Sequence, residues 1–404
     1  MSTGNFILLE NIQSTMSEAE EVLNEILAKV AKEQGYEDCQ ISSKQISSGG
    51  ANYTSFIYQA SISAPNKEEL NLFVKVAAAG EKMRSIAPFR IFEIESFGYN
   101  VLLKRYKELE EKYKVPEVHR LVTPKFYGNS DEYLREAIVL EDLSASGYTA
   151  YDRFKSVDWE YASKSVQNLA KLHALSIAWS IEDPEGFKAT DTMSMADSLD
   201  GIMAYLDTII TNALEVTREE NKERLSKFVR KIRDDKDYML MFYKPIKRPV
   251  IGHGDYRPSN LMHKVNEDGT INIISIDYQT LQRVNPILDL MYFIFNGSDK
   301  KFRDKHFKQT LELYYTELCA ALRRLDLDPN EIYPRDNFDY ELQEVMPYGL
   351  VTAMFCLLLV TVEEADAPTV SKDIAITDFA LTPSTLYKER LNDIVDGFVA
   401  MGII

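Results

Sequence analysis

Apolar residues at helical spacing mark the first element of the chain, a helix expected over residues 17–34. Leu23, Ile26 and Val30 share one face of it, and Gly35 provides the stop. Further along, alternating apolar and polar residues with turn residues between the runs are typical of strands. For the first 140 residues the pattern predicts helices at 17–34 and 92–113, strands at 52–63, 71–76, 125–128 and 136–140, and a turn at 47–51.

The rest of the chain has an almost wholly helical pattern with one interruption. The expected helices span residues 158–178, 193–216, 218–243, 286–295, 306–324, 340–360 and 384–400. A β insert is predicted instead between residues 249 and 277, with strands at 250–251, 261–264 and 271–276 and a turn at 266–269. A chain of 404 residues exceeds one ordinary core. We therefore expect an α+β fold of two lobes, a β-rich lobe with a leading helix over residues 1–142 and a helical lobe over residues 143–404.

Composition and charge narrow the classes of function. The chain carries 46 Lys and Arg against 63 Asp and Glu, a formal charge of −17, and has no run of basic residues. Because such a chain repels phosphate backbones and anionic lipid heads, neither nucleic acid nor a membrane surface is expected as its main partner. The longest apolar stretch, residues 348–360, is shorter than the ~20 residues of a spanning helix and is interpreted as a buried core helix.

Cysteine content and the N-terminus bear on the cellular compartment. Cys39, Cys319 and Cys356 are odd in number and lack CxxC or metal-binding spacing, which is typical of reduced thiols. The first 20 residues lack the basic and apolar regions of a signal peptide. Both features favour a cytoplasmic protein.

The β insert contains the first candidate for chemistry, the segment His253-Gly-Asp-Tyr-Arg-Pro-Ser-Asn260. Its H-x-D-x-x-x-x-N spacing is that of the catalytic loop of kinases, in which the aspartate accepts the hydroxyl proton and the asparagine binds Mg²⁺. A polar loop closed by an Asx turn is the alternative interpretation. The motif makes Asp255 a candidate base and Asn260 a candidate metal ligand.

A second carboxylate, Asp277, follows at the end of the next apolar strand. Because paired strands hold their ends together, Asp277 can reach the metal that Asn260 binds. A strand-end aspartate by itself is also a common helix cap or turn residue. The two pieces together, in this order, indicate phosphoryl transfer from ATP with Mg²⁺.

With these motifs and Leu288-Asp-Leu290, the chain resembles the aminoglycoside phosphotransferase and choline kinase superfamily. Within it, the chain is similar to the ecdysteroid kinase-like branch of insects, to which Gln279 after the metal aspartate also points. The other motifs of that branch are Ile138-Val-Leu-Glu-Asp-Leu143 with Gly147-Tyr148, Leu169-Ala-Lys-Leu-His-Ala-Leu-Ser176 and Leu386-Tyr-Lys-Glu-Arg390. The resemblance covers residues 47–404 and implies a two-lobed, protein-kinase-like (aminoglycoside phosphotransferase-like) fold.

The resemblance also implies roles for single residues. Gly49, Gly50 and Asn52 match the turn that covers the nucleotide, where a missing Cβ lets backbone N–H groups approach phosphates. An ordinary hairpin turn would need the same residues. The residues implied in phosphoryl transfer are Asp255 as the base, His253 as its orienting neighbour, and Asn260 and Asp277 as Mg²⁺ ligands.

Lys75 lies mid-strand among apolar residues, where the family has the lysine that holds the α- and β-phosphates. A surface strand would also carry a lysine there. Glu93 and Glu95 are candidates for its ion-pair partner, and they lie about 200° apart around a helix, so that both cannot face Lys75. We favour Glu95. At the junction of the lobes, Glu141 and Leu143 correspond to the residues whose backbone binds adenine, and a simple interlobe linker is the alternative.

Three further residues are assigned supporting roles or left open. Asp289, at a helix start, is expected to anchor the backbone of the catalytic loop. His173, on an apolar helix face, is expected to be a hydrogen-bonded core residue. Arg257 precedes Pro258 in a loop where many relatives carry other residues, and either contact with phosphate or substrate or pairing with surface carboxylates is consistent with its position.

The acceptor is expected to be a small molecule. Only eleven residues separate Asp277 from Asp289, too few for the peptide shelf of protein kinases. Residues 192–243 and 336–360 should wall the acceptor pocket. Their large side chains suit an apolar ligand and equally a core, namely Met203, Tyr205, Tyr238, Met241, Phe242, Met346, Tyr348, Met354 and Phe355. Phosphorylation of an ecdysteroid or similar lipophilic alcohol is the leading hypothesis; a choline- or ethanolamine-type kinase and a non-catalytic hydrophobic-ligand-binding protein are the alternatives.

Overall fold

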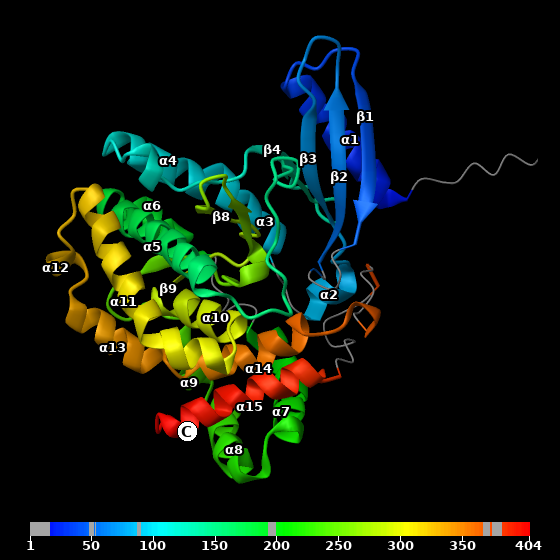
Figure 1. Cartoon of the computed structure of the whole chain (residues 1–404). Coiled ribbons are helices and arrows are strands. Elements are labelled where there is room, and N and C mark those ends of the chain that lie inside the picture. Colours follow the sequence, from blue (N-terminus) through cyan, green and yellow to red (C-terminus); the bar gives the residue numbers. More distant parts are fainter. Residues whose placement is uncertain are drawn as a thin grey trace, which may run out of the picture.

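A β-sheet with one covering helix stands at one end of the molecule, and a larger body of helices makes up the rest (Figure 1). The computed structural model describes residues 17–47, 52, 54–86, 90–192, 199–366, 372–373 and 382–404. The chain passes from the sheet into the helical body after residue 141. The predicted α+β fold with two lobes is confirmed.

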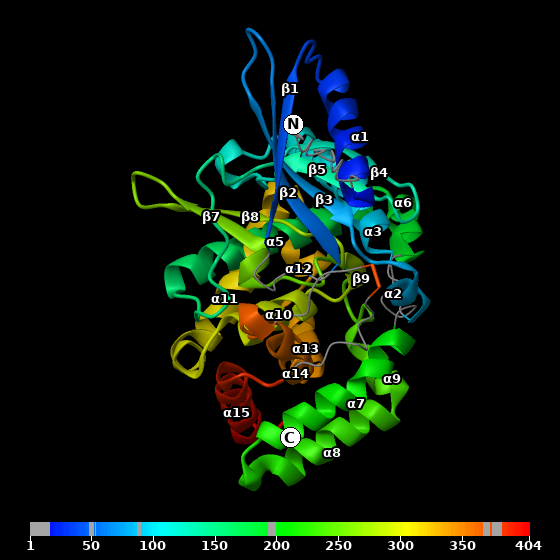
Figure 2. The ribbon, with the colours of Figure 1, turned by 90° about the vertical axis from the view of Figure 1, so that its right-hand side faces the viewer.

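The sheet that the described residues form is antiparallel and has the order β1-β2-β3-β5-β4. Helix α1 (Glu18–Glu33) covers one of its faces (Figure 2). The helix begins at Ser17, whose side chain forms a capping box with Glu20. The strands are β1 (Gln40–Ile46), β2 (Ser55–Ser63), β3 (Leu70–Ala77), β4 (Phe126–Ser130) and β5 (Ala137–Glu141).

The helix expected over residues 92–113 joins the two lobes. It consists of α3 (Ile91–Phe97) and α4 (Leu103–Lys112), continuous through a π-helical turn, and follows the short α2 (Glu81–Ile86). Its apolar side chains belong to the core of the helical lobe, separate from the core between α1 and the sheet. A Cβ at Gly98 would lie 2.9 Å from the Cβ of Tyr278, so glycine permits this close approach.

The helical lobe is built on one hydrophobic core. Helix α5 packs along α11, and α10 packs on α14. At the end farthest from the sheet, α7, α8 and α15 lie side by side (Figure 2). The helices are α5 (Trp159–Glu182), α6 (Pro184–Lys188), α7 (Leu199–Val216), α8 (Glu219–Asp234), α9 (Lys236–Phe242), α10 (Ile287–Gly297), α11 (Lys300–Arg324), α12 (Pro329–Ile332), α13 (Arg335–Val345), α14 (Tyr348–Val360) and α15 (Thr385–Ala400).

The predicted β insert is present within the helical lobe. Strand β6 (Val250–Gly252) pairs with β9 (Gln282–Val284), and β7 (Leu261–Val265) pairs with β8 (Ile271–Ser275). Leu261 lies opposite Ser275, so the residues before β7 and after β8 are neighbours. The insert therefore brings Asn260 and the segment ending in Asp277 to the same end of a hairpin.

Two expected helices are divided. The helix expected at 218–243 breaks at Asp235, which leaves helical geometry and caps α9 by accepting a hydrogen bond from Tyr238 N. The helix expected at 340–360 ends at Val345 and restarts after Pro347, whose ring is compatible with a helix start and not with a helix interior. Strand β1 was not predicted, because it is exposed along most of its length and lacks apolar alternation.

The apolar stretch at 348–360 forms α14, which is buried as expected. Within the described ranges, no single helix has the length and apolar character needed to cross a membrane. Helices α13 and α14 meet those criteria only as a pair, and they are bent by 54° relative to each other.

Glu110 on α4 should make stability depend on pH. Its side chain is buried and accepts a hydrogen bond from Leu121 N at 2.6 Å. Burial raises its pKa from 4.5 to about 7, so the folded state favours the protonated form, and this contribution to stability is lost as the pH rises through about 7. Between pH 4.5 and 8 the free energy of unfolding of the wild type should fall by roughly 2 kcal/mol through this group, after allowance for solvent screening. The variant Glu110→Gln cannot ionise there and should not show this fall.

Urea unfolding at a series of pH values checks this expectation. Glu108→Gln, at an exposed position of the same helix, is the matched control. Identical pH profiles for the Glu110 and Glu108 variants would contradict the assignment.

Candidate active site

A cavity of about 210 Å³ lies between the sheet and the β insert. Ile57 and Phe73 line it from the sheet, and Met262 and Ile276 line it from the insert. A cavity with apolar walls and a few polar groups suits a planar base that carries a charged tail. Predicted site residues that line this one cavity are Asn52, Lys75, Glu141, Leu143, Asn260 and Asp277.

The register of β3 directs Lys75 into this cavity. Its neighbours Val74 and Val76 pack in the core beneath α1, so the lysine side chain points to the opposite face of the sheet. The amine lies 2.8 Å from Glu95 Oε1 and 2.6 Å from Asp277 Oδ1. Burial alone would lower the pKa of Lys75, but the two carboxylates outweigh burial and raise it above its usual value. Lys75 therefore remains a cation in the lining of the cavity.

The ion pair predicted between Lys75 and Glu95 is present, with distances of 2.8 and 3.1 Å to the two carboxylate oxygens. Glu93 instead pairs with Arg90 at the surface. Burial raises the pKa of Glu95, and repulsion from Asp277 adds to this effect against the attraction of Lys75. Burial is the largest single effect on Asp277 and opposes ionisation, but the charge and hydrogen bond of Lys75, with the charges of Arg257 and His253, together outweigh it and lower the pKa of Asp277. Asp277 is therefore ionised within this cluster.

The loop after β6 is fixed by Asp289 at the start of α10. The two oxygens of Asp289 accept hydrogen bonds from His253 N at 2.7 Å and Gly254 N at 2.8 Å. Gly254 has a φ of 79°, and a Cβ there would lie 2.2 Å from Thr280 O, so the loop requires glycine. His173 is fully buried, with its Nε2 3.1 Å from Asp289 Oδ2. The structure confirms the expected loop anchor and the expected hydrogen-bonded core histidine.

His253 connects the catalytic loop to the end of β8. Its Nε2 lies 2.9 Å from Ile276 O, and Ile276 N donates to Asn260 O at 3.0 Å. These contacts fix the chain immediately before Asp277, which itself has a φ of 69°. His253 is fully buried between Tyr256 and Tyr278. Its contacts are those of an orienting residue.

Asp255 is held by two neighbours in the same loop. Asn260 Nδ2 donates to Asp255 Oδ2 at 2.8 Å and to Asp255 O at 3.0 Å. Because both of these contacts are to oxygen atoms, the amide orientation is fixed and Asn260 Oδ1 is left as a possible metal donor. Arg257 Nε lies 3.0 and 3.1 Å from the two Asp255 carboxylate oxygens.

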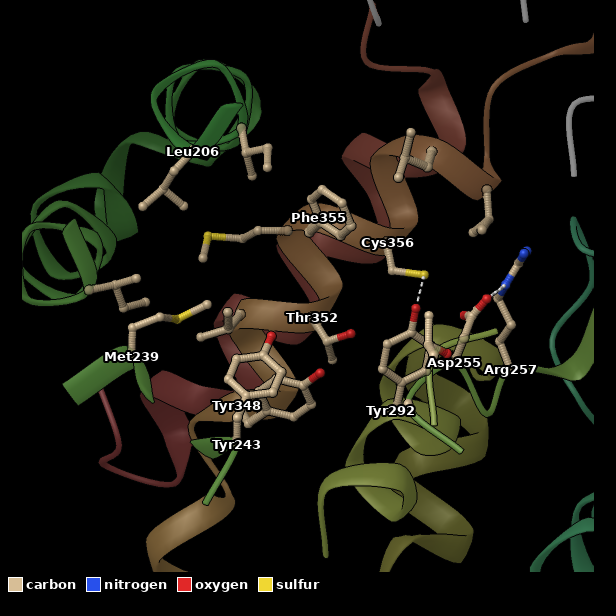
Figure 3. Close-up of a pocket in the computed structure, with 18 of the residues that line it drawn as sticks. Leu206, Met239, Tyr243, Asp255, Arg257, Tyr292, Tyr348, Thr352, Phe355 and Cys356 are labelled. Carbon is tan, nitrogen blue, oxygen red and sulfur yellow. Dashed lines mark hydrogen bonds and ion pairs between the residues drawn. The ribbon is translucent and has the colours of Figure 1, made fainter. Parts of the chain in front are cut away.

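A second cavity, of about 250 Å³, opens on the other side of Asp255 (Figure 3). Asp255 and Arg257 lie at one end of it, and Leu206 and Met239 lie at the other. Its walls come from α7, α8, α9 and α14, the segments predicted from sequence to surround an acceptor. Asn52 lines both this cavity and the one that holds Lys75, so the two cavities adjoin at the loop that carries Asp255.

The large side chains that suited either an apolar ligand or a core divide between these two roles. Tyr348, Met354 and Phe355 line the second cavity. The side chains of Tyr205, Tyr238, Met241, Phe242 and Met346 are in the core or pack against it. Helical periodicity gives the apolar face of a helix but not whether that face meets a neighbouring helix or a cavity, so the distinction could not be drawn from sequence.

Some predicted residues lie outside the described part of the chain, and some residues of the second cavity were not predicted. Gly49 and Gly50 lie outside the described residues, as does the side chain of Met203. Sequence reasoning missed Tyr292, Thr352 and Cys356, which line the second cavity near Asp255. Their apolar helices carried no motif that could have marked them.

The sequence profile of the Ecdysteroid kinase-like family matches residues 49–327 of the chain. No functionally curated protein matches the sequence.

Among solved structures, the fold is similar to Plasmodium vivax ethanolamine kinase, at 10% identity and a TM-score of 0.42, over 90% of this chain and 83% of that one. The GDP complex of wild-type aminoglycoside 2'-phosphotransferase-IIIa is 10% identical with a TM-score of 0.39, over 81% and 98%. Glucosamine kinase in complex with glucosamine, ADP and inorganic phosphate is 14% identical with a TM-score of 0.33, over 83% and 80%. At these scores the likenesses do not bear on the substrate or site of this chain.

Proposed function

Since the chain belongs to the ecdysteroid kinase-like family, we propose that it phosphorylates a hydroxyl group of an ecdysteroid or a similar lipophilic alcohol. The family assignment identifies an ATP-dependent phosphotransferase that acts on hydroxyl groups of small molecules. In the proposed reaction Asp255 is the base, and Asn260 and Asp277 hold Mg²⁺. We also propose a cytoplasmic location, because Cys39, Cys319 and Cys356 are free thiols.

One observation carries the proposal: a largely apolar cavity opens directly on Asp255, beside a separate cavity that contains Lys75. A base must lie within hydrogen-bond reach of the proton that it accepts. An alcohol that fills the apolar cavity would place its hydroxyl next to Asp255, and ATP in the other cavity would place its phosphates next to Lys75. The two substrates then meet at the loop between the cavities, where positioning supplies much of the rate.

The chain's own residues divide the work in the proposed reaction. Lys75 binds the phosphates, and Glu95 holds Lys75 in place. Glu141 and Leu143, at the edge of the first cavity, bind adenine through their backbone, and Gly49, Gly50 and Asn52 cover the phosphates. The γ-phosphoryl group passes from the β-phosphate oxygen to the acceptor oxygen, and the hydroxyl proton passes to Asp255.

The donor set near Lys75 fits Mg²⁺. Within the described residues, no cluster of three or more His, Cys, Asp or Glu side chains could hold a metal alone. Mg²⁺ needs no such cluster, because it is bound through one or two protein oxygens together with substrate phosphates and water. The ionised Asp277 and the free Oδ1 of Asn260 line the same cavity and match this requirement. When bound, Mg²⁺ offsets the negative charge that develops on the phosphates.

The lining of the second cavity favours a neutral acceptor over choline. Asp255 is the single acidic side chain among the described residues that line this cavity, and it is already paired with Arg257. A quaternary ammonium group is bound over aromatic faces, and unpaired acidic groups nearby strengthen its binding by charge attraction. Tyr243, Tyr292 and Tyr348 supply aromatic rings, but the acidic part of such a cage is missing from the described lining.

A substrate panel tests the proposal. Purified protein is incubated with MgATP and ecdysone, cholesterol, farnesol or choline, and phosphorylated product is measured by mass spectrometry. We expect phosphorylation of at least one lipophilic alcohol and none of choline. Turnover of choline alone would refute the proposed acceptor class.

Ligand binding measured in parallel separates a kinase from a non-catalytic binding protein. If a lipophilic alcohol binds but neither the wild type nor Asp255→Asn shows ligand-dependent ATP turnover, the binding-only alternative holds.

A further inference from the structure

Arg257 faces Asp255 because of the backbone between them. Arg257 is extended, with φ of −110° and ψ of 158°, as expected for a residue before proline. Arg257 N also donates to Asp255 O at 2.9 Å, so the chain turns at Tyr256 and brings the two side chains together. The guanidinium Nε therefore meets both carboxylate oxygens, at 3.0 and 3.1 Å, while Nη1 donates to Ser259 Oγ at 2.9 Å.

These contacts restrain the orientation of the proposed base. With Asn260 Nδ2 on Oδ2 at 2.8 Å, donors from two side chains hold the Asp255 carboxylate. Both Asp255 and Arg257 line the acceptor cavity, where the carboxylate lies among Tyr292 and Cys356 (Figure 3). A base held in this way keeps its orientation before the acceptor binds, and a displacement of about 1 Å in such a group can cost roughly 100-fold in rate.

The positive charge of Arg257 also offsets the negative charge of the Asp255 carboxylate. Arg257 is 8% exposed, and the Asp255 side chain is 14% exposed. A guanidinium remains protonated at every relevant pH, so the pair is neutral as a unit. An unpaired Asp255 would repel the negative phosphates that must approach it, and little water is present to screen that repulsion. The surface pairing that the sequence left open for Arg257 is excluded by its burial.

We propose that Arg257 is a positioning residue for phosphoryl transfer, which holds the Asp255 carboxylate toward the acceptor and offsets its negative charge beside the nucleotide phosphates. The inference rests on the proposed function, because Asp255 must be the base for Arg257 to act through it. It assigns to Arg257 a role in the catalytic step and none in binding either substrate.

Steady-state kinetics of Arg257→Met test this role, with MgATP and whichever alcohol of the panel the wild type phosphorylates fastest. We expect kcat to fall roughly 100-fold, with the KM for ATP changed less than about 3-fold. Arg257→Lys keeps the positive charge but loses the Nε contact geometry, so its kcat should lie between those of Met and wild type. A raised KM for ATP at unchanged kcat would overturn the proposal, because Arg257 would then act on the nucleotide directly.

A double-mutant cycle gives a second readout that a structural role would not affect. If Arg257 acts through Asp255, adding Arg257→Met to Asp255→Asn should lower the single-turnover rate by less than about 2-fold. Independent losses that multiply in the double variant would overturn the proposal. If Arg257→Met does not fold, the same cycle with Arg257→Lys decides the question.

Arg84→Met is the matched control for loss of a buried arginine. Arg84 pairs with Glu136 in the sheet lobe, where the two side chains are 15% and 10% exposed. This variant should lose thermal stability without loss of kcat. A wild type that phosphorylates no alcohol of the panel would refute the proposed function itself, whereas an active wild type with multiplicative losses would refute only the role of Arg257.

Discussion

The variant Asp255→Asn should lose phosphoryl transfer, with kcat reduced on the order of 10³-fold, and should still bind ATP. An amide has nearly the same shape as the carboxylate but cannot accept the hydroxyl proton. Asp255 faces the acceptor cavity and is absent from the lining of the cavity that contains Lys75, so the affinity for ATP should change little. Initial rates with radiolabelled ATP and calorimetric titration of ATP measure the two quantities.

Asp268→Asn is the control for this experiment, since Asp268 lies exposed in the turn of the same β insert. It should leave kcat unchanged. If Asp255→Asn kept more than a tenth of the wild-type kcat, Asp255 would not be the base.

The second large effect is expected for Asp277→Asn, which should abolish the dependence of ATP binding on Mg²⁺. Asp277 pairs with Lys75 in the cluster that also contains Glu95, and its pKa is lowered there. Loss of a residue that only orients a metal ligand lowers the affinity for the metal about 10- to 100-fold. Loss of a ligand itself should therefore lower the affinity for Mg²⁺ more than about 100-fold. Calorimetric titration of ATP with Mg²⁺ and with EDTA measures the change, and kcat should fall with it.

Asp142→Asn is the matched control, because Asp142 lines the same cavity but bonds to Gln59 and Ser144, away from Lys75. This variant should keep the Mg²⁺ effect. An Asp277→Asn protein that still gains affinity for ATP on addition of Mg²⁺ would show that the metal is held elsewhere.

Part of the candidate site follows from local sequence, because the residues of its catalytic loop are close neighbours along the chain. Asp255 and Asn260 are five residues apart in one loop, and their hydrogen bond is formed within that loop. Its position within an apolar strand and the family resemblance pointed to Lys75. Helix periodicity excluded that Glu93 and Glu95 both face it, and the family's F-x-x-E pattern favoured Glu95, which forms the ion pair. Patterns of this kind depend on the geometry of one element, which the sequence specifies directly.

The roles of Arg257 and of the cavity walls depend on packing between distant segments. The sequence did not decide whether Arg257 pairs with surface carboxylates or contacts phosphate or substrate. Its burial beside α10 and α14, which carry Tyr292 and Cys356, excludes the surface role. The same holds for the side chains of α7, α9 and α14, which carry apolar residues on more than one face. Which of those faces borders the cavity depends on the neighbouring helices.

The sequence by itself determined the two lobes, the β insert and the residues proposed for phosphoryl transfer, because hydrophobic periodicity and loop spacing are local properties. It also indicated the segments that surround the acceptor. The tertiary structure decided where Asp235 and Pro347 divide the helices, which side chains line the acceptor cavity, and how Arg257 holds Asp255. These features arise where segments far apart in the chain come into contact, and close packing between them selects one arrangement among several that each segment alone would permit.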